Sequence, residues 1–155
     1  MNKVKWLWSM TIGVGLVLLY AAPSAYFVDT QGVYAGLKLP VFALSGLWIT
    51  VGWSIVYLAD IVVISRLVYY RKSVFLTAAV VFCGFLNAVW CIVFFVFGAL
   101  GVAFALSVFM TALVLATAVF LIREESFSLI FWQLKVVWYA YSCIVCYYVF
   151  MLNQG

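Results

Sequence analysis

The chain has 155 residues, of which 70% are hydrophobic and only 8% are charged. A soluble domain averages about 25% charged residues, so this chain lacks the polar surface that would cover a globule in water, and its solvent must be lipid. The net charge of +4 comes from short basic clusters between apolar stretches, which argues against nucleic-acid binding and for membrane topology.

A membrane-crossing helix needs about 20 apolar residues. Five runs meet this requirement, at residues 5–27, 42–65, 74–96, 101–122 and 127–151. We therefore predict an all-α membrane protein, a single domain over 1–155 built as a bundle of five transmembrane helices. A β-barrel is not expected, because polar and apolar residues do not alternate. The first run is longer than the apolar region of a signal peptide, so we expect a retained helix.

Basic residues predict the orientation of the bundle. With five helices, one side of the membrane holds most of the basic residues, namely Lys3, Lys5, Arg66, Arg71, Lys72 and Arg123. The opposite side holds only Lys38. The positive-inside rule then puts the N-terminus in the cytoplasm. A bacterial cell membrane is favoured, with the mitochondrial outer membrane as the alternative. The first loop, about 28–41, is the longest connection and is expected to cover a ligand cavity.

The third run carries a stripe of polar and aromatic side chains. Asn87, Trp90 and Phe94 share one helix face, and Phe95 follows directly. An amide and an indole in an apolar wall would suit a large, flat, mostly apolar ligand. The alternatives are that Asn87 joins helices through hydrogen bonds and that the tryptophans only pack the core.

Two further runs carry similar stripes. Their members are Trp53, Tyr57 and Asp60 in the second run and Lys135, Trp138 and Ser142 in the fifth. A lone charge in mid-membrane costs roughly 2.5–3.5 kcal/mol. Asp60 and Lys135 lie at similar depths on the same side, so we predict that they pair and close the inner floor of the pocket. The alternative is that each reaches the inner interface separately.

Metal and redox chemistry is not expected. The chain has no histidine, and its four cysteines (Cys83, Cys91, Cys143 and Cys146) lie in apolar runs, where they suit buried packing. We expect no metal and no required cofactor. The small pairs Gly84/Ala88 and Ala112/Ala116 suit close helix contacts and leave a homodimer open.

Several motifs occur in a characteristic order. They are Tyr34, Leu37, Pro40 and Phe42; Trp53 and Tyr57; Leu86, Asn87, Trp90, Phe94 and Phe95; Trp138; and Leu152-Asn153. In this order the chain resembles the translocator-protein family, also called TspO/MBR or tryptophan-rich sensory proteins, over about residues 30–153. The departures are Leu39 for a lysine, Leu44-Ser45 for a proline pair, Leu134-Lys135 for a proline and tyrosine, and Cys146 for an asparagine.

The resemblance implies a membrane receptor or translocator that binds a porphyrin, haem or another flat hydrophobe for transport, sensing or disposal. The expected ligand-binding residues are Tyr34, Lys38, Pro40, Trp53, Tyr57, Asn87, Trp90, Phe94, Trp138 and Ser142. Lys38, near the mouth, would meet a propionate.

Two alternative functions remain open. The family's link to light-dependent porphyrin breakdown would make Trp53 and Trp138 catalytic. A small proton-coupled drug exporter would use Asp60. Catalysis is otherwise not favoured, because no carboxylate pair or activated nucleophile is present.

Overall fold

The computed structural model describes residues 2–28 and 32–154, and within them it contains helices and no strand. The elements are α1 (Lys3–Phe27), α2 (Val33–Gly36), α3 (Gly46–Tyr69), α4 (Val74–Cys91), the π-helical η1 (Ile92–Val96), α5 (Leu100–Glu124) and α6 (Ser126–Leu152). Five helices, with α4 and η1 counted as one, are long and apolar enough to span a membrane. The predicted all-α membrane fold with five spanning helices is confirmed.

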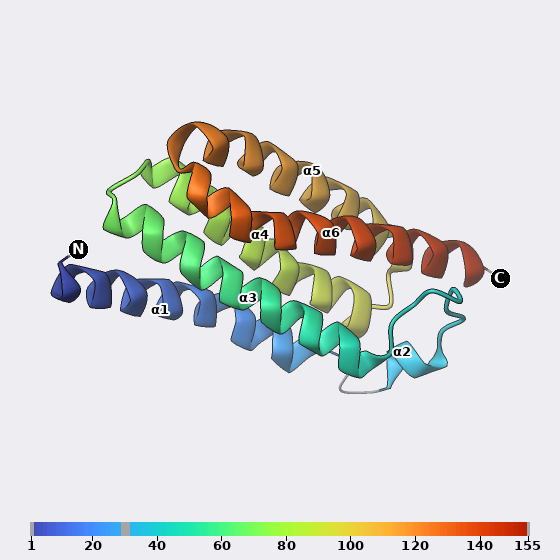
Figure 1. Ribbon diagram of the computed structural model, residues 1–155. Helices are drawn as coiled ribbons and strands as arrows, with labels where there is room; N and C mark the ends of the chain where they lie inside the picture. The colour runs from blue at the N-terminus through green and yellow to red at the C-terminus, as the bar shows by residue number, and fades with distance from the viewer. Residues whose placement is uncertain (1, 29–31, 155) are drawn as a thin grey trace.

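The long helices run side by side along one bundle (Figure 1), and their contacts form a closed ring in the order α1, α3, α6, α5, α4. Each helix packs against the next, and α4 returns to α1. Gly13 permits the closest part of the α1–α3 contact, because a Cβ there would lie only 2.9 Å from the carbonyl oxygen of Ile61. Such a ring has a centre that side chains from all five helices can reach.

Along the helix axes, the half of the bundle nearer the N-terminus is filled by apolar side chains. Its buried members include Val63, Ile64, Leu67, Val80, Val114, Leu121 and Trp132. The indole N–H of Trp132 donates to the carbonyl of Val114 at 2.9 Å, which satisfies a polar group that burial would otherwise leave unpaired. We call this half, which ends at the N-terminus, the packed half.

An ion pair lies at the end of the packed half, between the C-terminal part of α3 and the start of α6. Arg66 Nη2 lies 2.7 Å from Glu125 Oε1, and the two side chains also share a second hydrogen bond. Glu125 in addition accepts from the backbone N–H of Ser128 at 2.8 Å and caps α6. The hydrogen bond from Arg66, with those from Ser128, lowers the pKa of Glu125 to about 2.

The second predicted helix was placed four residues too early. Residues 42–65 were predicted, whereas α3 spans Gly46–Tyr69. Its start is delayed because Tyr141 of α6 binds the preceding segment: its hydroxyl accepts from Leu44 N at 2.9 Å and donates to Phe42 O at 3.3 Å. Its end extends past Arg66 because the pair with Glu125 satisfies that charge at the helix end. The other four spans agree with the predictions to within two residues at each end.

The third span ends in a π-helical turn. Ile92–Val96 follows α4 directly, and Gly98 (φ +60°) then reverses the chain into α5. The turn brings Phe94 and Phe95 together, with ring centroids 4.8 Å apart. Both rings reach the interior at the end of the bundle opposite the packed half.

Candidate ligand cavity

A cavity of about 620 Å³ occupies the other half of the bundle, at the end where α2 and the C-terminus lie. Ligand pockets in proteins measure about 300–1,000 Å³. Side chains from α1, α3, α4, η1, α5 and α6, together with Tyr34 of α2, line it. The cavity is therefore large enough for a small organic molecule.

Most of the predicted binding residues meet in this cavity. Those that line it are Tyr34, Trp53, Tyr57, Asn87, Trp90, Phe94, Trp138 and Ser142. Trp53 lies edge-on to Trp138 at 6.0 Å between ring centroids, and Trp90 stacks on Phe94 at 4.8 Å. The aromatic rings thus stand in ordered groups along the wall, a geometry that suits stacking against a flat ligand.

Two predicted binding residues do not line the cavity. Lys38 is exposed and Pro40 is buried in the loop after α2, and neither contributes to the wall. The side chain of Asn153 binds the backbone of Lys38 on both sides, accepting from its N–H and donating to its carbonyl, each at 3.0 Å. Lys38 and Pro40 thus belong to the loop at the end of the bundle and not to the cavity wall.

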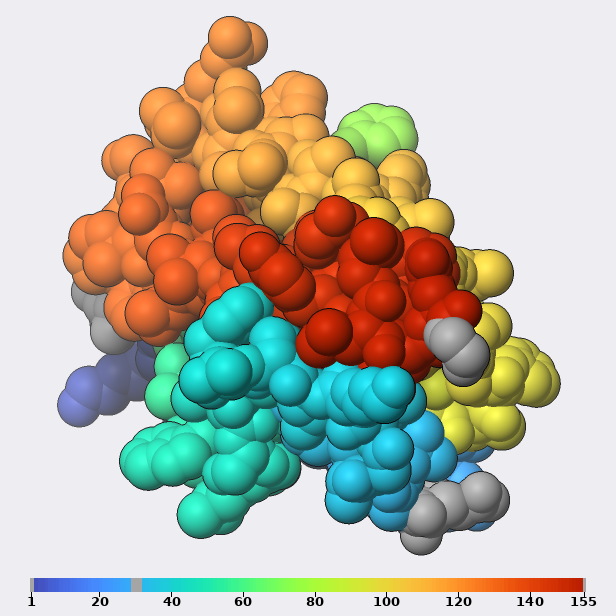
Figure 2. All heavy atoms as spheres, turned by 90° about the vertical axis from the view of Figure 1, so that its right-hand side faces the viewer, coloured from blue at the N-terminus to red at the C-terminus, as the bar shows by residue number. Residues whose placement is uncertain are grey.

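The loop 32–45 lies at the end of the bundle, beside the C-terminal turns of α6 (Figure 2). The hydroxyl of Tyr34 donates to the carbonyl of Leu44 at 3.1 Å, and burial raises the pKa of this hydroxyl. Contacts from Tyr141 and Asn153 attach the same loop to α6. Positions 29–31 of the predicted covering loop lie outside the described residues.

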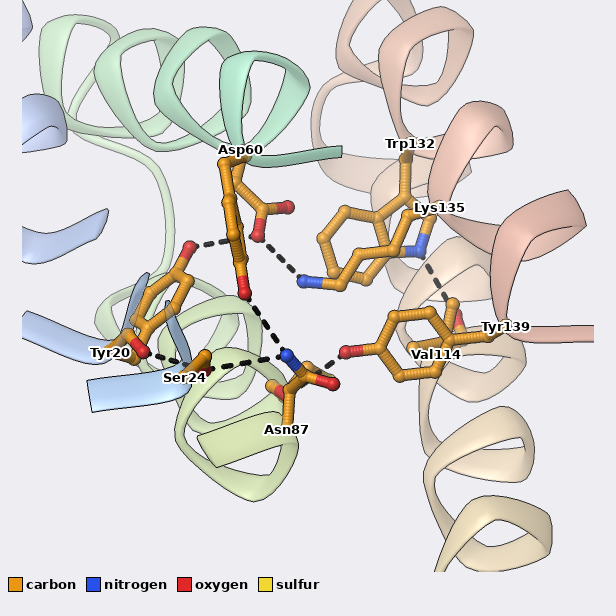
Figure 3. A network of polar contacts seen from close by, with 10 residues as sticks. Tyr20, Ser24, Asp60, Asn87, Val114, Trp132, Lys135 and Tyr139 are labelled. Atoms are coloured by element: carbon orange, nitrogen blue, oxygen red, sulfur yellow. Dashed lines mark hydrogen bonds and ion pairs between the residues drawn. The ribbon is translucent and has the colours of Figure 1, made fainter. Parts of the chain in front are cut away.

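Asn87 lines the cavity and also joins helices through hydrogen bonds. Its amide nitrogen donates to Tyr57 Oη at 3.1 Å and to Ser24 Oγ at 3.4 Å, which ties α4 to α3 and α1 (Figure 3). Its oxygen, Oδ1, is buried without a partner among the described residues. Asn87 is thus an interhelical bridge that still has an acceptor unused.

Trp90 differs from expectation. Its indole N–H donates to the carbonyl of Ala103 at 2.9 Å, so it holds α4 against α5 and is not free for a polar edge of a ligand. The indole N–H of Trp138, in contrast, is buried and has no hydrogen-bond partner among the described residues. The available indole donor therefore comes from α6 and not from α4.

Asp60 and Lys135 form a buried ion pair, with Lys135 Nζ 2.7 Å from Asp60 Oδ2. The hydroxyl of Tyr20 donates to the same oxygen at 2.7 Å, and the ammonium lies 4.7 Å from the centre of the Trp132 ring (Figure 3). Neither charged residue lines the cavity. The pair lies below the floor, one helical turn beyond Tyr57 on α3 and Trp138 on α6.

Sequence reasoning missed the contribution of α1. Leu18, Ala21 and Ser24 line the cavity, and Tyr20 reaches the ion pair beneath it. Tyr20 and Ser24 are one turn apart, and this polar pair in an apolar run was the available signal. Tyr139 and Tyr141, which follow Trp138 on α6 and also line the cavity, were missed as well.

The small-residue pairs have different surroundings. A Cβ on Gly84 would lie 2.5 Å from the ring of Tyr20, so this glycine serves the α1–α4 contact within one chain. Ala112 and Ala116 are exposed on α5. A homodimer stays a prediction.

The fold and the cavity together define a multi-pass integral membrane protein with an internal site of small-molecule size. A model of the TspO/MBR family matches residues 10–152, nearly the whole chain, and the chain belongs to this family. The comparison with curated proteins gave no match. Family membership supports a membrane translocator or receptor kind of function.

Proposed function

We propose that this protein binds a flat, mostly apolar ligand in the cavity between its five helices, and that a porphyrin is the class that fits best. The observation that carries the proposal is a cavity of about 620 Å³ walled by Trp53, Trp90 and Trp138 from three different helices. Indole faces stack on extended π-systems and bury large apolar area. Binding would serve transport, sensing or disposal of the ligand.

The position of the cavity supports a ligand that lies with one edge toward the loop 32–45. The macrocycle would lie deep, against Trp53 and Trp138. Carboxylates at its outer edge would remain near the exposed Lys38, on the solvent side of the loop. With the N-terminus in the cytoplasm, as the basic residues predict, the loop would face outward.

Titration of the purified protein with protoporphyrin, followed by tryptophan quenching, tests the proposal. The Trp138→Phe change should weaken binding by up to about 12-fold, because the smaller phenylalanine ring keeps only part of an aromatic contact worth about 0.5–1.5 kcal/mol. Trp8→Phe is the matched control, since Trp8 is exposed at the opposite end of α1. Equal affinity in a Ser142→Trp variant, whose indole would fill part of the cavity, would place binding elsewhere.

A porphyrin-degrading activity is a second candidate, and the edge-on contact of Trp53 with Trp138 beside the cavity favours it. Light-driven oxidation of the ring would need oxygen and a nearby oxidisable indole, and these two indoles adjoin the proposed ligand position. Bleaching of bound protoporphyrin under light tests this. Retained binding with lost bleaching in the Trp53→Phe/Trp138→Phe variant would indicate an enzyme.

The exporter alternative depended on Asp60 as a proton-coupling acid. In the structure Asp60 is 1% exposed and bonded to both Lys135 and Tyr20. The neighbouring ammonium neutralises the carboxylate, so the arrangement supports a structural pair over a transport site. Gradient-driven uptake that is lost in Asp60→Asn would reverse this assessment.

A further inference from the structure

A shallow groove runs along the outer face of α4, apart from the ligand cavity. Its lining residues are Phe75, Ala78, Ala79, Val81, Phe82 and Phe85. The three phenylalanine rings are exposed, and residues at spacings of three and four share one helix face. The small alanine side chains between the rings leave the hollow. Because α4 belongs to a spanning segment, this exposed face lies against lipid.

The groove has the length of one membrane leaflet. Ten residues separate Phe75 from Phe85, which is about 15 Å along a helix axis. The hydrocarbon core of a bilayer is about 30 Å thick, so one leaflet contributes about 15 Å. Phe75 lies in the first turn of α4, at the end of the bundle where the N-terminus lies (Figure 1). The groove therefore begins near one membrane surface and ends near the midplane, as an acyl chain does.

Two basic residues stand at the surface end of the groove. Arg71 is exposed and Lys72 is half-buried, and both come directly before α4 and its N-cap Ser73. Among the residues that the structure describes, the ion pairs are those of Arg66 with Glu125 and of Lys135 with Asp60. The charges of Arg71 and Lys72 are thus not neutralised within the described part of the chain.

The backbone of Arg71 has a conformation that favours glycine. Its φ is +51°, in the left-handed region. The turn is fixed by hydrogen bonds from Arg71 N to the carbonyl of Val68 at 3.2 Å and from Lys72 N to that of Leu67 at 2.9 Å. A residue kept in a strained conformation points to a use outside the fold. Here the side chain supplies a positive charge at the membrane surface.

A second copy of the chain suits this face less well than a lipid does. Two copies with the same orientation in the membrane, related by a two-fold axis, would meet with the same ends together. Arg71 and Lys72 of one copy would then approach the same residues of the other, and like charges repel. An anionic headgroup brings the opposite charge to the same place. Charge complementarity therefore selects the lipid.

We propose that an anionic phospholipid binds to the outer face of α4, with one acyl chain in the groove and its phosphate beside Arg71 and Lys72. The orientation predicted from the basic residues puts this site in the cytoplasmic leaflet, where negatively charged lipids attract basic segments. The site is separate from the cavity, so the proposal does not rest on the proposed function.

Native mass spectrometry of the full chain in detergent tests the headgroup. Phosphatidylglycerol should bind about tenfold more tightly than phosphatidylcholine with the same acyl chains, because two basic residues meet its net charge. Arg71→Gly/Lys72→Gln should remove most of this preference, and glycine suits the left-handed position, so the variant should fold. Lys3→Gln/Lys5→Gln removes the same charge from exposed positions at the same end of the bundle and should keep the preference.

A second pair of variants tests the groove. Ala78→Trp fills the hollow with an indole and should weaken binding of both lipids by about fivefold or more, because the chain loses apolar contact area. Ala112→Trp, at an exposed position on α5, is the matched control and should bind both lipids like the unaltered chain. Unchanged helical circular dichroism shows that each variant is folded.

Three outcomes would overturn the proposal. Equal binding of the two lipids would show that the headgroup charge is not recognised. An equal loss of preference in the two charge variants would show a general surface potential instead of a site. Unchanged lipid binding in Ala78→Trp would reject the groove, and a dimer that this variant abolishes, in spectra without bound lipid, would assign the face to a second copy.

Discussion

Lys135 Nζ lies 2.7 Å from Asp60 Oδ2, and each residue is only 1% exposed. The pair joins α6 to α3, and the hydroxyl of Tyr20 adds α1 to the same oxygen. Three of the five helices are thus linked beneath the cavity.

Removal of one partner of this pair should destabilise the protein more than removal of both. Asp60→Asn or Lys135→Met alone leaves a buried group without its partner and should cost about 3–5 kcal/mol. The double variant leaves no uncompensated charge and should cost clearly less than the sum. Unfolding of the four proteins in detergent gives the coupling free energy. A double variant as unstable as the sum would show that the contact adds nothing.

Gly52 should be intolerant of any side chain, because a Cβ there would lie 2.0 Å from the ring of Trp138. Gly52→Ala would force the indole to move and should cost about 1–3 kcal/mol of stability. It should also weaken ligand binding, since Trp138 lines the cavity. Gly15→Ala is the matched control, because nothing lies within 4 Å of its added methyl. It should be neutral or stabilising by about 0.5–1 kcal/mol. Equal effects at the two glycines would contradict the packing argument.

The Arg66–Glu125 pair should make stability depend on acidity. The pKa of Glu125 is about 2, below its usual 4.5. The stabilisation is therefore complete above about pH 4.5 and is lost as the pH falls through about 2. Glu125→Gln should flatten this part of the stability profile. Unfolding measured between pH 2 and pH 7 checks this, with Glu124→Gln at the exposed neighbour as control. An unchanged profile in Glu125→Gln would rule out this contribution.

Asn153 should control the loop over the cavity. Its side chain forms two 3.0 Å hydrogen bonds with the backbone of Lys38. Asn153→Ala removes both, and at about 1 kcal/mol each the protection of the Lys38 amide should fall by roughly tenfold or more. Hydrogen exchange measures this directly. Gln154→Ala, at the exposed next position, should leave exchange unchanged, and equal exchange in both variants would argue against the clamp.

The sequence predicted the helices because hydrophobic length and helical period are local properties. Asn87, Trp90 and Phe94 could be assigned to one face by spacing alone. The start of α3 could not be predicted, because it depends on Tyr141, nearly 100 residues away. Local apolarity from Phe42 onward favours helix, and a distant hydroxyl determines where the helix begins.

The sequence alone determined that the chain is a membrane protein with five spanning helices, because this follows from composition and hydrophobic length. It also determined which aromatic stripes face inward, because this follows from helical periodicity. Only the tertiary structure decided how those stripes are used. It assigned the indole of Trp90 to a backbone carbonyl and left that of Trp138 unpaired. It also added α1 to the wall and placed Asp60 and Lys135 below the floor. Hydrogen-bond partners depend on which helices become neighbours, and that information is not contained in any single stretch of chain.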